Sequence, residues 1–453
     1  MNNKLHTTEI FAIILGAIIG MGSFILPGSK FLPTAGVINT TIGLFIGTMC
    51  IVVIERSYRF MMSCEITEGG EFSFANMCFG DRHSFVVGWF LFLAYMTLIP
   101  LNASAFPIVL NYIFPDALNF GYLYTIAGDA VYIGEVLVST LLIALFATIN
   151  LVGVKSTGKV QKYIIYCMVI SIFVVFVAMM INADFAVFNT NYVENYTFDF
   201  SAVLVVIAVT PFLFIGFDAI PQLVKDLGVS KRKASAISVV ALLFGMMIYM
   251  ILNFMTGLAY SPSQASTFGW ALGSGVMENV GAWAFVIITI AIACAVSAGI
   301  NGFMVCSQKL IGSMARSDVM PNFLSKQNKY GVNKNTIYFV SIIGCCLCLF
   351  GREVVVWIVD MCSFGAGVAY FYVCLGTVIK SQDKVTKFFG VAGIVISVGV
   401  LLLLVLPFSP AKLSLAPMLF LIAWIIAGAV IGFFIFKNKK VGNKKVGNKR
   451  ADK

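Results

Sequence analysis

The chain consists of long apolar segments joined by short polar connections, and this pattern restricts the folds open to it more than any other feature. Apolar residues form 60% of the 453 positions and charged residues only 11%, whereas charged residues form about 25% of a soluble globular domain. A water-soluble fold could not bury that much apolar surface. Because a helix needs roughly 20 apolar residues to cross the hydrocarbon layer, the segments predict a multi-pass membrane protein.

The apolar segments are expected to be helical. Lipid offers no partners for backbone N–H and C=O groups, so only helices or closed barrels can cross it. Barrel strands alternate apolar and polar residues, and the stretch 391–406 shows no such alternation. We therefore predict an all-α membrane protein with about twelve transmembrane helices. Their expected ranges, each to within about four residues, are 9–33, 36–60, 84–113, 131–151, 160–182, 201–224, 233–258, 280–312, 335–351, 353–379, 387–408 and 415–437.

The distribution of positive charge predicts how the chain is oriented. With the N-terminus inside, only Lys30, Arg352 and Lys412 of the 30 Lys and Arg residues fall on the outer side. Lys and Arg are absent from three outer connections, 114–130, 183–200 and 259–279. Since short cytoplasmic loops are enriched in positive residues, we expect a plasma-membrane protein with both termini cytoplasmic. The net charge of +10 then follows from topology and implies no nucleic-acid partner.

Cysteines, histidines and the C-terminal tail give no sign of a cofactor or a metal site. The eleven cysteines lie mostly inside the spans, where packing is their expected role, and His6 and His83 are remote from the Cys345–Cys348 cluster. The tail repeats KKVGN and is rich in lysine. We expect residues 438–453 to be a disordered cytoplasmic anchor with weak attraction to anionic lipid.

Two apolar segments are interrupted by glycine at comparable places. The first reads GAIIGMGSFILPG over Gly16–Gly28, and the sixth reads TPFLFIGFDAIP over Thr210–Pro221 with Gly216 at its centre. Inside a helix, each glycine costs about 1 kcal/mol relative to alanine and each proline about 3. The clusters predict that both helices unwind in mid-membrane, although close helix packing or simple kinks would also use such residues.

An unwound segment in the membrane needs a polar partner for its backbone. The N-terminus of the half-helix after the first break favours an anionic group such as a carboxylate, while unwound carbonyls accept an ammonium. A zwitterion satisfies both requirements. The two breaks lie five spans apart, which is the spacing expected of an inverted repeat of spans one to five and six to ten.

Four motifs together carry a resemblance to a known family. They are GAIIGMGSFILPG, EGGEFSFANMCFG at Glu68–Gly80, GFDAIPQ at Gly216–Gln222 and SAGINGFMVCSQKLIGSMARSDVMP at Ser297–Pro321. Over most of its length the sequence resembles permeases of the amino acid, polyamine and organocation (APC) superfamily. The resemblance implies a five-plus-five inverted-repeat, LeuT-like core with broken helices 1 and 6. The implied divisions are an N-terminus (1–8), a ten-helix core (9–380), two peripheral helices (387–437) and a basic tail (438–453).

The resemblance also implies which residues bind substrate. Ile19, Gly20, Met21 and Gly22 match the break that receives the substrate carboxylate, although relatives often have Ser, Thr or Ala where Met21 stands. Ile215 and Gly216 match the break that faces the α-amino group. Phe212 matches an aromatic that closes over the substrate, and lipid-facing bulk is the alternative. Asn102 and Asn301 are polar residues that either line the pocket or hydrogen-bond between helices.

Asp218 and Ser297 are the candidates for coupling or gating. A carboxylate in mid-membrane costs at least about 2.5–3.5 kcal/mol, which makes Asp218 a functional candidate, with a hydrogen bond to unwound backbone as the alternative. Some relatives carry a lysine in span five, where this chain has Met168. Ser297 is a weak sodium-site candidate, with helix packing as its alternative. A co-transported proton is thus expected in place of a bound cofactor, and sodium stays open.

These features predict a secondary active transporter, not an enzyme. We expect a permease that moves an amino acid or related amine by alternating access, as a proton-coupled symporter or an exchanger. The sequence contains no GxxxxGK[ST] loop for a nucleotide. The alternatives are a membrane sensor that binds an amino acid without moving it, and an ion channel. The expected partners are the small-molecule substrate and the lipid bilayer, and the sequence is compatible with a homo-oligomer.

Overall fold

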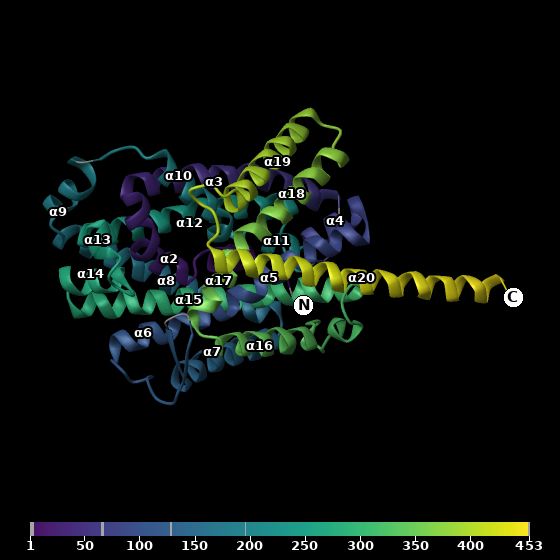
Figure 1. Ribbon diagram of the computed structural model, residues 1–453, viewed down its shortest axis with the longest axis horizontal. Coiled ribbons are helices and arrows are strands. Elements are labelled where there is room, and N and C mark those ends of the chain that lie inside the picture. The colour runs from purple at the N-terminus through teal and green to yellow at the C-terminus, as the bar shows by residue number, and fades with distance from the viewer. Residues whose placement is uncertain (1–3, 65–67, 127–128, 195, 452–453) are drawn as a thin grey trace.

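The protein is an elongated bundle of helices. The computed structural model describes residues 4–64, 68–126, 129–194 and 196–451, and nearly all of these residues are helical (Figure 1). Ten helical segments among them are long and apolar enough to cross a membrane. The prediction of a multi-pass helical membrane protein is therefore confirmed.

The elements of the first half of the chain include the two that carry the first break. They are α1 (Thr7–Ile18), α2 (Met21–Leu26), the π-helix η1 (Pro27–Phe31), α3 (Leu32–Cys64), α4 (Glu71–Phe79), α5 (Asp81–Ala103), α6 (Ala105–Ile113), β1 (Tyr122–Ile126), β2 (Asp129–Tyr132), α7 (Ile133–Leu151), α8 (Val154–Asn182), α9 (Phe185–Asn189), the π-helix η2 (Thr190–Glu194), α10 (Phe200–Phe214) and α11 (Ala219–Gln222).

The elements of the second half continue the bundle. They are α12 (Lys231–Ala259), α13 (Pro262–Ala265), α14 (Ala271–Asn279), α15 (Ala282–Arg316), the 3-10 helix η3 (Asn322–Ser325), α16 (Lys334–Cys348), α17 (Arg352–Asp360), α18 (Cys362–Lys380), α19 (Lys384–Val405) and α20 (Leu415–Ala451).

Side-chain caps fix where several of the long helices begin. The Asp199 carboxylate accepts from the backbone N–H of Ser201 at 2.8 Å and starts α10. Ser230 accepts from the N–H of Lys233 at 3.3 Å and starts α12. These caps satisfy backbone donors that have no partner within the helix. Polar residues thus mark the helix ends, while apolar runs fix the helix lengths.

The predicted boundary between the first two spans is marked by a glycine. Helical segments follow one another from Met21 through α2, η1 and α3 to Cys64, with one kink inside α3. At Gly36 the backbone turns, with φ at +63°, which favours glycine because it has no Cβ. Segments on the two sides of Gly36 therefore run in different directions.

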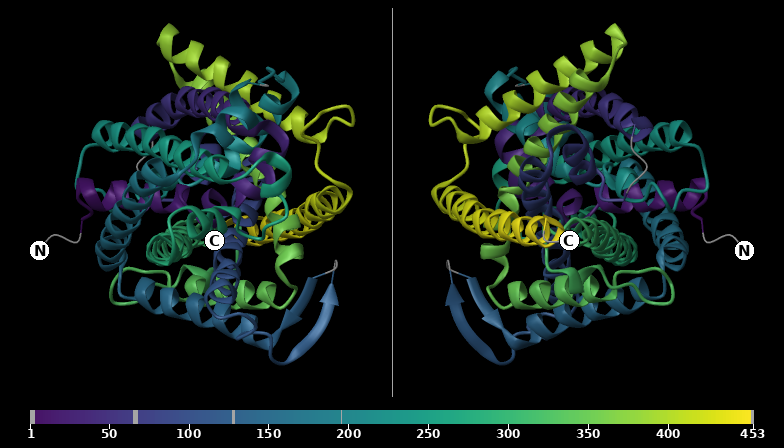
Figure 2. Two further views of the ribbon diagram at one scale, coloured as in Figure 1. Left: turned by 90° about the vertical axis from the view of Figure 1, so that its left-hand side faces the viewer. Right: turned by 90° about the vertical axis from the view of Figure 1, so that its right-hand side faces the viewer.

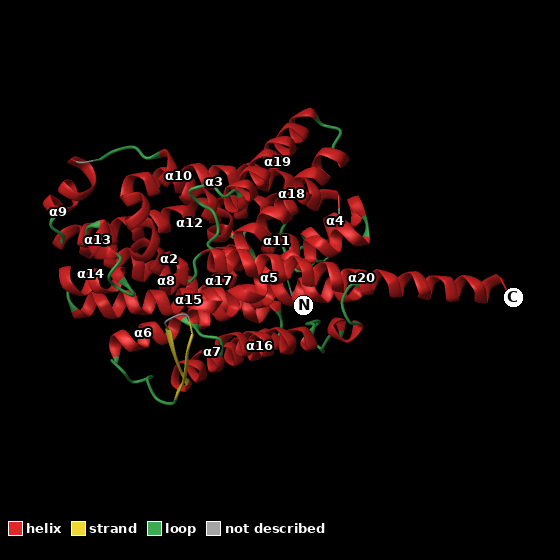
Figure 3. Ribbon diagram, in the orientation of Figure 1, coloured by secondary structure: helices red, strands yellow, loops and turns green. Residues whose placement is uncertain are grey.

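The connection between α6 and α7 is folded as strands, so the all-α prediction was wrong there. β1 and β2 form an antiparallel pair in which Tyr124 lies opposite Val131 and Thr125 opposite Ala130 (Figure 3). Tyrosine, threonine, isoleucine and valine favour strands. Lipid dictates helices only where the chain crosses it, and this connection is not among the candidate spans.

The C-terminal tail also differs from its prediction. The backbone of α20 continues as a helix to Ala451 and extends beyond the rest of the bundle (Figure 1), whereas we expected residues 438–453 to be disordered. Each residue added to an existing helix gains a hydrogen bond, lysine is a good helix former, and the tail contains no proline. The apolar helix therefore propagates into the basic sequence.

The two ends of the bundle carry different elements. In Figure 1 the helices run roughly horizontally, with α9, α13 and α14 at the left and α4 and the end of α20 at the right. We call the left side the α14 end. The other, where Lys225, Lys309 and Arg316 gather, we call the basic end. Viewed along the helices in Figure 2, α19 projects from one edge of the bundle, far from the β1–β2 hairpin.

Candidate functional site

The first helical segment is interrupted between α1 and α2. α1 ends at Ile18, the backbone of Ile19 is extended (φ −95°, ψ 90°), and α2 begins at Met21 after Gly20 (φ −108°, ψ −162°). The N–H of Met21 donates to the side-chain oxygen of Asn102 on α5 at 3.0 Å. The peptide groups of Ile19 and Gly20 are thus taken out of the regular helical pattern in the middle of the bundle.

The second interruption separates α10 from α11. α10 ends at Phe214, and Gly216 has φ at +119°, a conformation that L side chains rarely adopt. A Cβ on Gly216 would lie 2.4 Å from the Cβ of Ala17 on α1. Both the backbone conformation and the contact with α1 therefore require glycine at this position.

Tyr249 of α12 joins the two interruptions. Its hydroxyl lies 3.1 Å from the carbonyl oxygen of Ile18 and 3.4 Å from that of Leu213. These carbonyls belong to the last turns of α1 and α10, where helical acceptors lose their partners. One buried hydroxyl thus holds the ends of both half-helices side by side.

A small cavity lies between the two interruptions. Its volume, measured as the space open to the centre of a water molecule, is about 20 Å³. That is room for roughly one water molecule. Its walls are Ala17, Ile18, Gly20, Met21, Gly22, Leu98, Leu101, Asn102, Phe212, Ile215, Tyr249 and Phe303. The lining is therefore mainly apolar, and side chains must move before a larger solute fits.

Asp218 stabilises the backbone of the second interruption. It is fully buried, its Oδ1 accepts from the N–H of Gly216 at 2.7 Å, and its Oδ2 accepts from the hydroxyl of Tyr95 at 2.6 Å. The carboxylate replaces helical hydrogen bonds that the break removes. These contacts agree with the alternative given for Asp218, a hydrogen bond to unwound backbone. They are compatible with a second role in coupling.

Asp218 has a carboxyl neighbour, Glu71 of α4. Glu71 is also fully buried and accepts from the hydroxyl of Tyr58 and the amide of Gln222, each at 2.9 Å. Burial raises the pKa of Glu71 well above its usual range, and the charge of Asp218 raises it further. Two fully buried carboxyl groups thus act on each other beside the second interruption.

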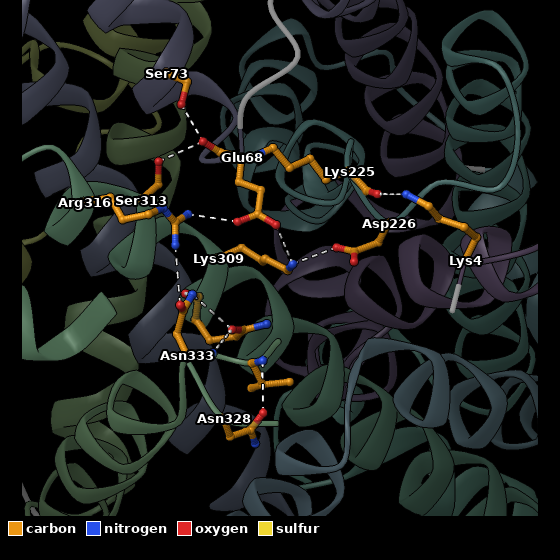
Figure 4. A network of polar contacts seen from close by, with 12 residues as sticks. Lys4, Glu68, Ser73, Lys225, Asp226, Lys309, Ser313, Arg316, Asn328 and Asn333 are labelled. Atoms are coloured by element: carbon orange, nitrogen blue, oxygen red, sulfur yellow. Dashed lines mark hydrogen bonds and ion pairs between the residues drawn. The ribbon is translucent and has the colours of Figure 1, made fainter. Parts of the chain in front are cut away.

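An ion-pair network closes the basic end beneath these carboxyls. The ammonium of Lys309 on α15 is 2.9 Å from Glu68 and 2.7 Å from Asp226, and Arg316 is 2.9 Å from Glu68 (Figure 4). Lys309 is only 3% exposed. Burial acts to raise the pKa of Glu68, but the charges of Lys309 and Arg316 outweigh it and hold that pKa below its usual value.

The segment that precedes α1 is attached to the same end. The N–H of Leu5 donates to the carbonyl of Asp226 at 2.8 Å, and the N–H of Gly228 donates to the carbonyl of Leu5 at 2.9 Å. The Lys4 ammonium also donates to the carbonyl of Lys225 (Figure 4). The start of α1 therefore moves with the connection between α11 and α12 unless these bonds break.

Sequence comparison decides which family this architecture represents. A family model described as amino acid permease matches residues 5–441. The chain belongs to the amino acid permease family. The resemblance to the APC superfamily inferred from the motifs is thereby confirmed.

Three curated relatives agree with this assignment. This permease is 22% identical over 393 residues to the branched-chain amino acid permease BcaP of Lactococcus lactis, covering 83% of this chain and 81% of the relative. It is 22% identical over 454 residues to the branched-chain amino acid permease BcaP of Bacillus subtilis, covering 97% and 94%. It is 24% identical over 342 residues to the vacuolar cationic amino acid transporter 4 of Arabidopsis thaliana, covering 71% of this chain and 54% of the relative.

The chain therefore spans about half the length of the Arabidopsis relative and most of the two bacterial ones. All three are named as carriers of amino acids. The family and these relatives indicate that the permease is a transporter rather than an enzyme.

The structure brings most of the predicted binding residues of the permease together. Those that line the central cavity are Gly20, Met21, Gly22, Asn102, Phe212 and Ile215. Ile19 and Gly216 adjoin them, and their backbones form the two breaks. Phe212 also lines a second cavity of about 270 Å³, so its side chain lies between two cavities.

Two predicted polar residues lie elsewhere. Ser297 is half-buried on α15 and is not among the residues that line the central cavity. Asn301 bonds Asn150 of α7 at 2.8 Å and Gln161 of α8 at 2.6 Å. Asn301 therefore joins three helices, which was the alternative to a place in the pocket.

Several residues near the site were missed by sequence reasoning. Tyr249 and Glu71 are the clearest cases, and Arg352 is a third, because its guanidinium lies 3.3 Å from the Met21 sulfur. Arg352 had been counted only as an outer positive charge. The only available signal was that these polar or charged residues stand within or next to long apolar segments. The sequence does not show which element each side chain faces, because that depends on the tertiary fold.

Proposed function

We propose that the permease carries an amino acid with an uncharged, apolar side chain across the membrane. The observation that carries this proposal is that two helix interruptions meet at a cavity with mainly apolar walls. An α-amino acid brings a carboxylate and an ammonium, which unwound peptide groups bind, and a side chain, which the walls select. The described residues that line this cavity include no Asp, Glu, Lys or Arg.

The relatives support an apolar substrate in different degrees. The two bacterial proteins are named as branched-chain amino acid permeases, and they cover more of this chain than the Arabidopsis protein, which is named as a cationic amino acid transporter. A cationic side chain in such a site needs a carboxylate nearby, because an unpaired buried charge is costly. The lining of the central cavity, as far as the structure describes it, offers none.

The substrate is oriented by the two breaks. Its carboxylate faces the backbone N–H groups at Gly20 and Gly22, next to the Met21 N–H that donates to Asn102 and near the positive end of the α2 dipole. Its ammonium faces the unwound carbonyls around Ile215. Phe212 moves to admit the substrate and closes over it afterwards, in keeping with its position between two cavities.

Transport proceeds by alternating access. A central cavity of about 20 Å³ is too small for any amino acid, so the site must widen before the substrate binds. Opening towards the basic end separates Lys309 from Asp226 and Glu68. Opening towards the α14 end moves Phe212, and it separates Arg352 from Met21.

The driving force is a co-transported proton or an exchanged solute. The Glu71–Asp218 pair supports a proton, because its hydrogen bonds connect the second interruption to α4 at the basic end. Protonation and release at this pair would change the hydrogen bonds of Gly216 and thus the break itself. Sodium has less support, since Ser297 does not line the cavity.

The basic end faces the cytoplasm, and the permease resides in the plasma membrane. The excess of Lys and Arg at this end supports the orientation. The chain makes twelve crossings when α1 with α2 counts as one broken crossing and α16 as another beside the longer spans. The breaks then fall in crossings one and six, the arrangement of an inverted five-plus-five repeat.

Uptake into proteoliposomes tests the proposal. We expect radiolabelled leucine to enter, lysine and glutamate to be excluded, and an inward proton gradient or internal leucine to accelerate the flux. Leucine binding without flux under any gradient would identify a sensor and contradict transport.

A pair of variants tests the site itself. Gly20→Leu should abolish uptake with normal membrane insertion, because even a Cβ at residue 20 would lie 2.7 Å from the Asn102 oxygen. Gly399→Leu is the control, since a Cβ there has no neighbour within 4 Å. Normal uptake by Gly20→Leu would remove this residue from the site.

A further inference from the structure

A second site candidate lies at the basic end, away from the transport cavity. α3, α12 and α19 enclose a pocket of about 440 Å³, a size typical of ligand sites. Four cationic side chains line it, Arg56, Arg59, Lys231 and Arg232. We call it the basic pocket. None of its lining residues takes part in the central cavity or in the ion pairs of Lys309.

Two of these cations, Arg56 and Lys231, contact neighbouring groups. The guanidinium of Arg56 lies over the ring of Phe389 on α19, 5.6 Å from its centroid, which is a cation–π contact. The ammonium of Lys231 donates to the carbonyl of Met62 in the last turn of α3. Arg56 of α3 and Lys231 of α12 are therefore held on different helices around one space.

Two acidic groups among the described residues lie near these cations, and both have other partners. Glu55 is 2% exposed, accepts from the Ser235 hydroxyl at 2.6 Å, and is the carboxylate that the charges of Arg56 and Arg59 act on. Asp383 is engaged at the start of α19, where it accepts from the N–H and the hydroxyl of Thr386. Within the described part of the chain, no ion pair includes Arg56, Arg59 or Arg232. Among the described residues, the lining of the pocket thus carries four cations and no acid, which suits an anion.

One side of the basic pocket continues onto an apolar surface. Val385 and Phe389 of α19 line the pocket, and Val385 is 63% exposed. Further along the helix, Phe388 and Val395 are 68% and 66% exposed. α19 stands at the edge of the bundle (Figures 1 and 2). A ligand with a phosphate in the pocket can therefore also lay hydrocarbon chains on the apolar surface of α19.

We propose that the basic pocket binds the phosphate of an anionic phospholipid, with the acyl chains along α19. Arginine fits phosphate because its planar fork of donors matches the oxygens. Basic pockets between membrane helices at the cytoplasmic side recognise anionic headgroups. The bound lipid joins α19 to α3 and to the start of α12.

Thermal unfolding of the purified permease tests this site. We expect phosphatidylglycerol to raise Tm by about 3 °C or more, and phosphatidylcholine to have no such effect. Arg56→Gln/Arg59→Gln/Arg232→Gln should lose the response. The matched control Lys159→Gln/Lys326→Gln/Lys329→Gln removes three exposed charges outside the pocket and should keep it. Inorganic phosphate at equal ionic strength is the third addition.

The outcomes separate the possible ligands. Stabilisation by phosphatidylglycerol alone, lost only in the arginine variant, supports the proposal. If inorganic phosphate raises Tm as much as phosphatidylglycerol does, the proposal of a lipid as the occupant is overturned. Equal responses of the arginine variant and the wild type overturn the site. Should the triple variant fail to fold, native mass spectrometry of the wild type and of Arg232→Gln decides, because about threefold fewer retained phosphatidylglycerol molecules are expected in the variant.

Discussion

The ammonium nitrogen of Lys309 on α15 lies 2.7 Å from a carboxylate oxygen of Asp226, in the connection between α11 and α12. This ion pair joins the longest described span of the second half of the chain to the segment that follows the second helix interruption. Lys309 is also 2.9 Å from Glu68, so one buried ammonium holds two acidic connections together (Figure 4). Any motion that opens the basic end must separate these groups.

Asp226→Asn should open the basic end more often. Removing one charge of a buried pair leaves the other poorly compensated, which weakens the closed state. We expect labelling of Cys306, which is fully buried on α15 near Lys309, to accelerate about tenfold. Peptide-resolved mass spectrometry after maleimide treatment measures this rate. Arg316→Gln is the control, because its pair with Glu68 is more exposed and contributes less. Equal labelling of the two variants would show that the Lys309–Asp226 pair does not hold the end closed.

The helical framework was predictable because lipid leaves the backbone little choice. The span predicted at 233–258 is α12, Lys231–Ala259, and that at 280–312 is α15, Ala282–Arg316. The β1–β2 hairpin and the helical end of α20 were not predicted. Outside the hydrocarbon layer, small differences in local helix and strand propensity decide whether strands pair or a helix continues. The length of an apolar segment, on which the prediction rested, carries no information about them.

Gly216→Ala should lower stability more than backbone strain alone explains. The new Cβ would lie 2.4 Å from the Cβ of Ala17 and would have to push α1 away. Gly281→Ala is a matched control, because Gly281 also has a positive φ (+106°) but open space around its Cβ position. Strain costs about 1–3 kcal/mol in both variants, and the clash adds about 1–3 kcal/mol in Gly216→Ala. Equal falls in Tm would mean that close contact with α1 is unimportant.

The glycines of the candidate site were visible in the sequence, but their partners were not. Gly20 and Gly216 stand out because glycine is costly inside a lipid-facing helix. Tyr249 and Glu71 contact the two breaks and Asp218 from α12 and α4, far away in the sequence. Single tyrosines and glutamates carry no local sign of such a role, since only the packing of helices decides what a side chain meets.

Tyr249→Phe should loosen the two half-helices without changing the shape of the site. The variant removes the hydroxyl that bonds the carbonyls of Ile18 and Leu213, which costs about 1 kcal/mol. We expect a lower Tm and a higher KM for uptake. Tyr163→Phe, at a residue 67% exposed on α8, should change neither. An unchanged KM for Tyr249→Phe would assign Tyr249 to packing only.

Glu71→Gln should remove a pH dependence from both stability and uptake. Because the pKa of Glu71 is raised in the folded protein, its stabilising contribution is complete below the ordinary glutamate pKa. As the pH rises, the unfolded chain loses its proton first, and the folded state loses stability until the pH passes the raised pKa. The glutamine variant has no proton to lose there, so its Tm should stay flatter over this range. Its leucine uptake should respond less to pH for the same reason.

The exposed Glu194→Gln, on η2, is the control and should keep the pH profile of the wild type. If Glu71 and Asp218 share a proton, the pH profiles of Glu71→Gln and Glu194→Gln must differ. Glu71 is buried beside another acid, whereas Glu194 is exposed. Coincident profiles of Tm and uptake in both variants would leave the Glu71–Asp218 pair without a role in proton coupling and favour exchange as the driving force.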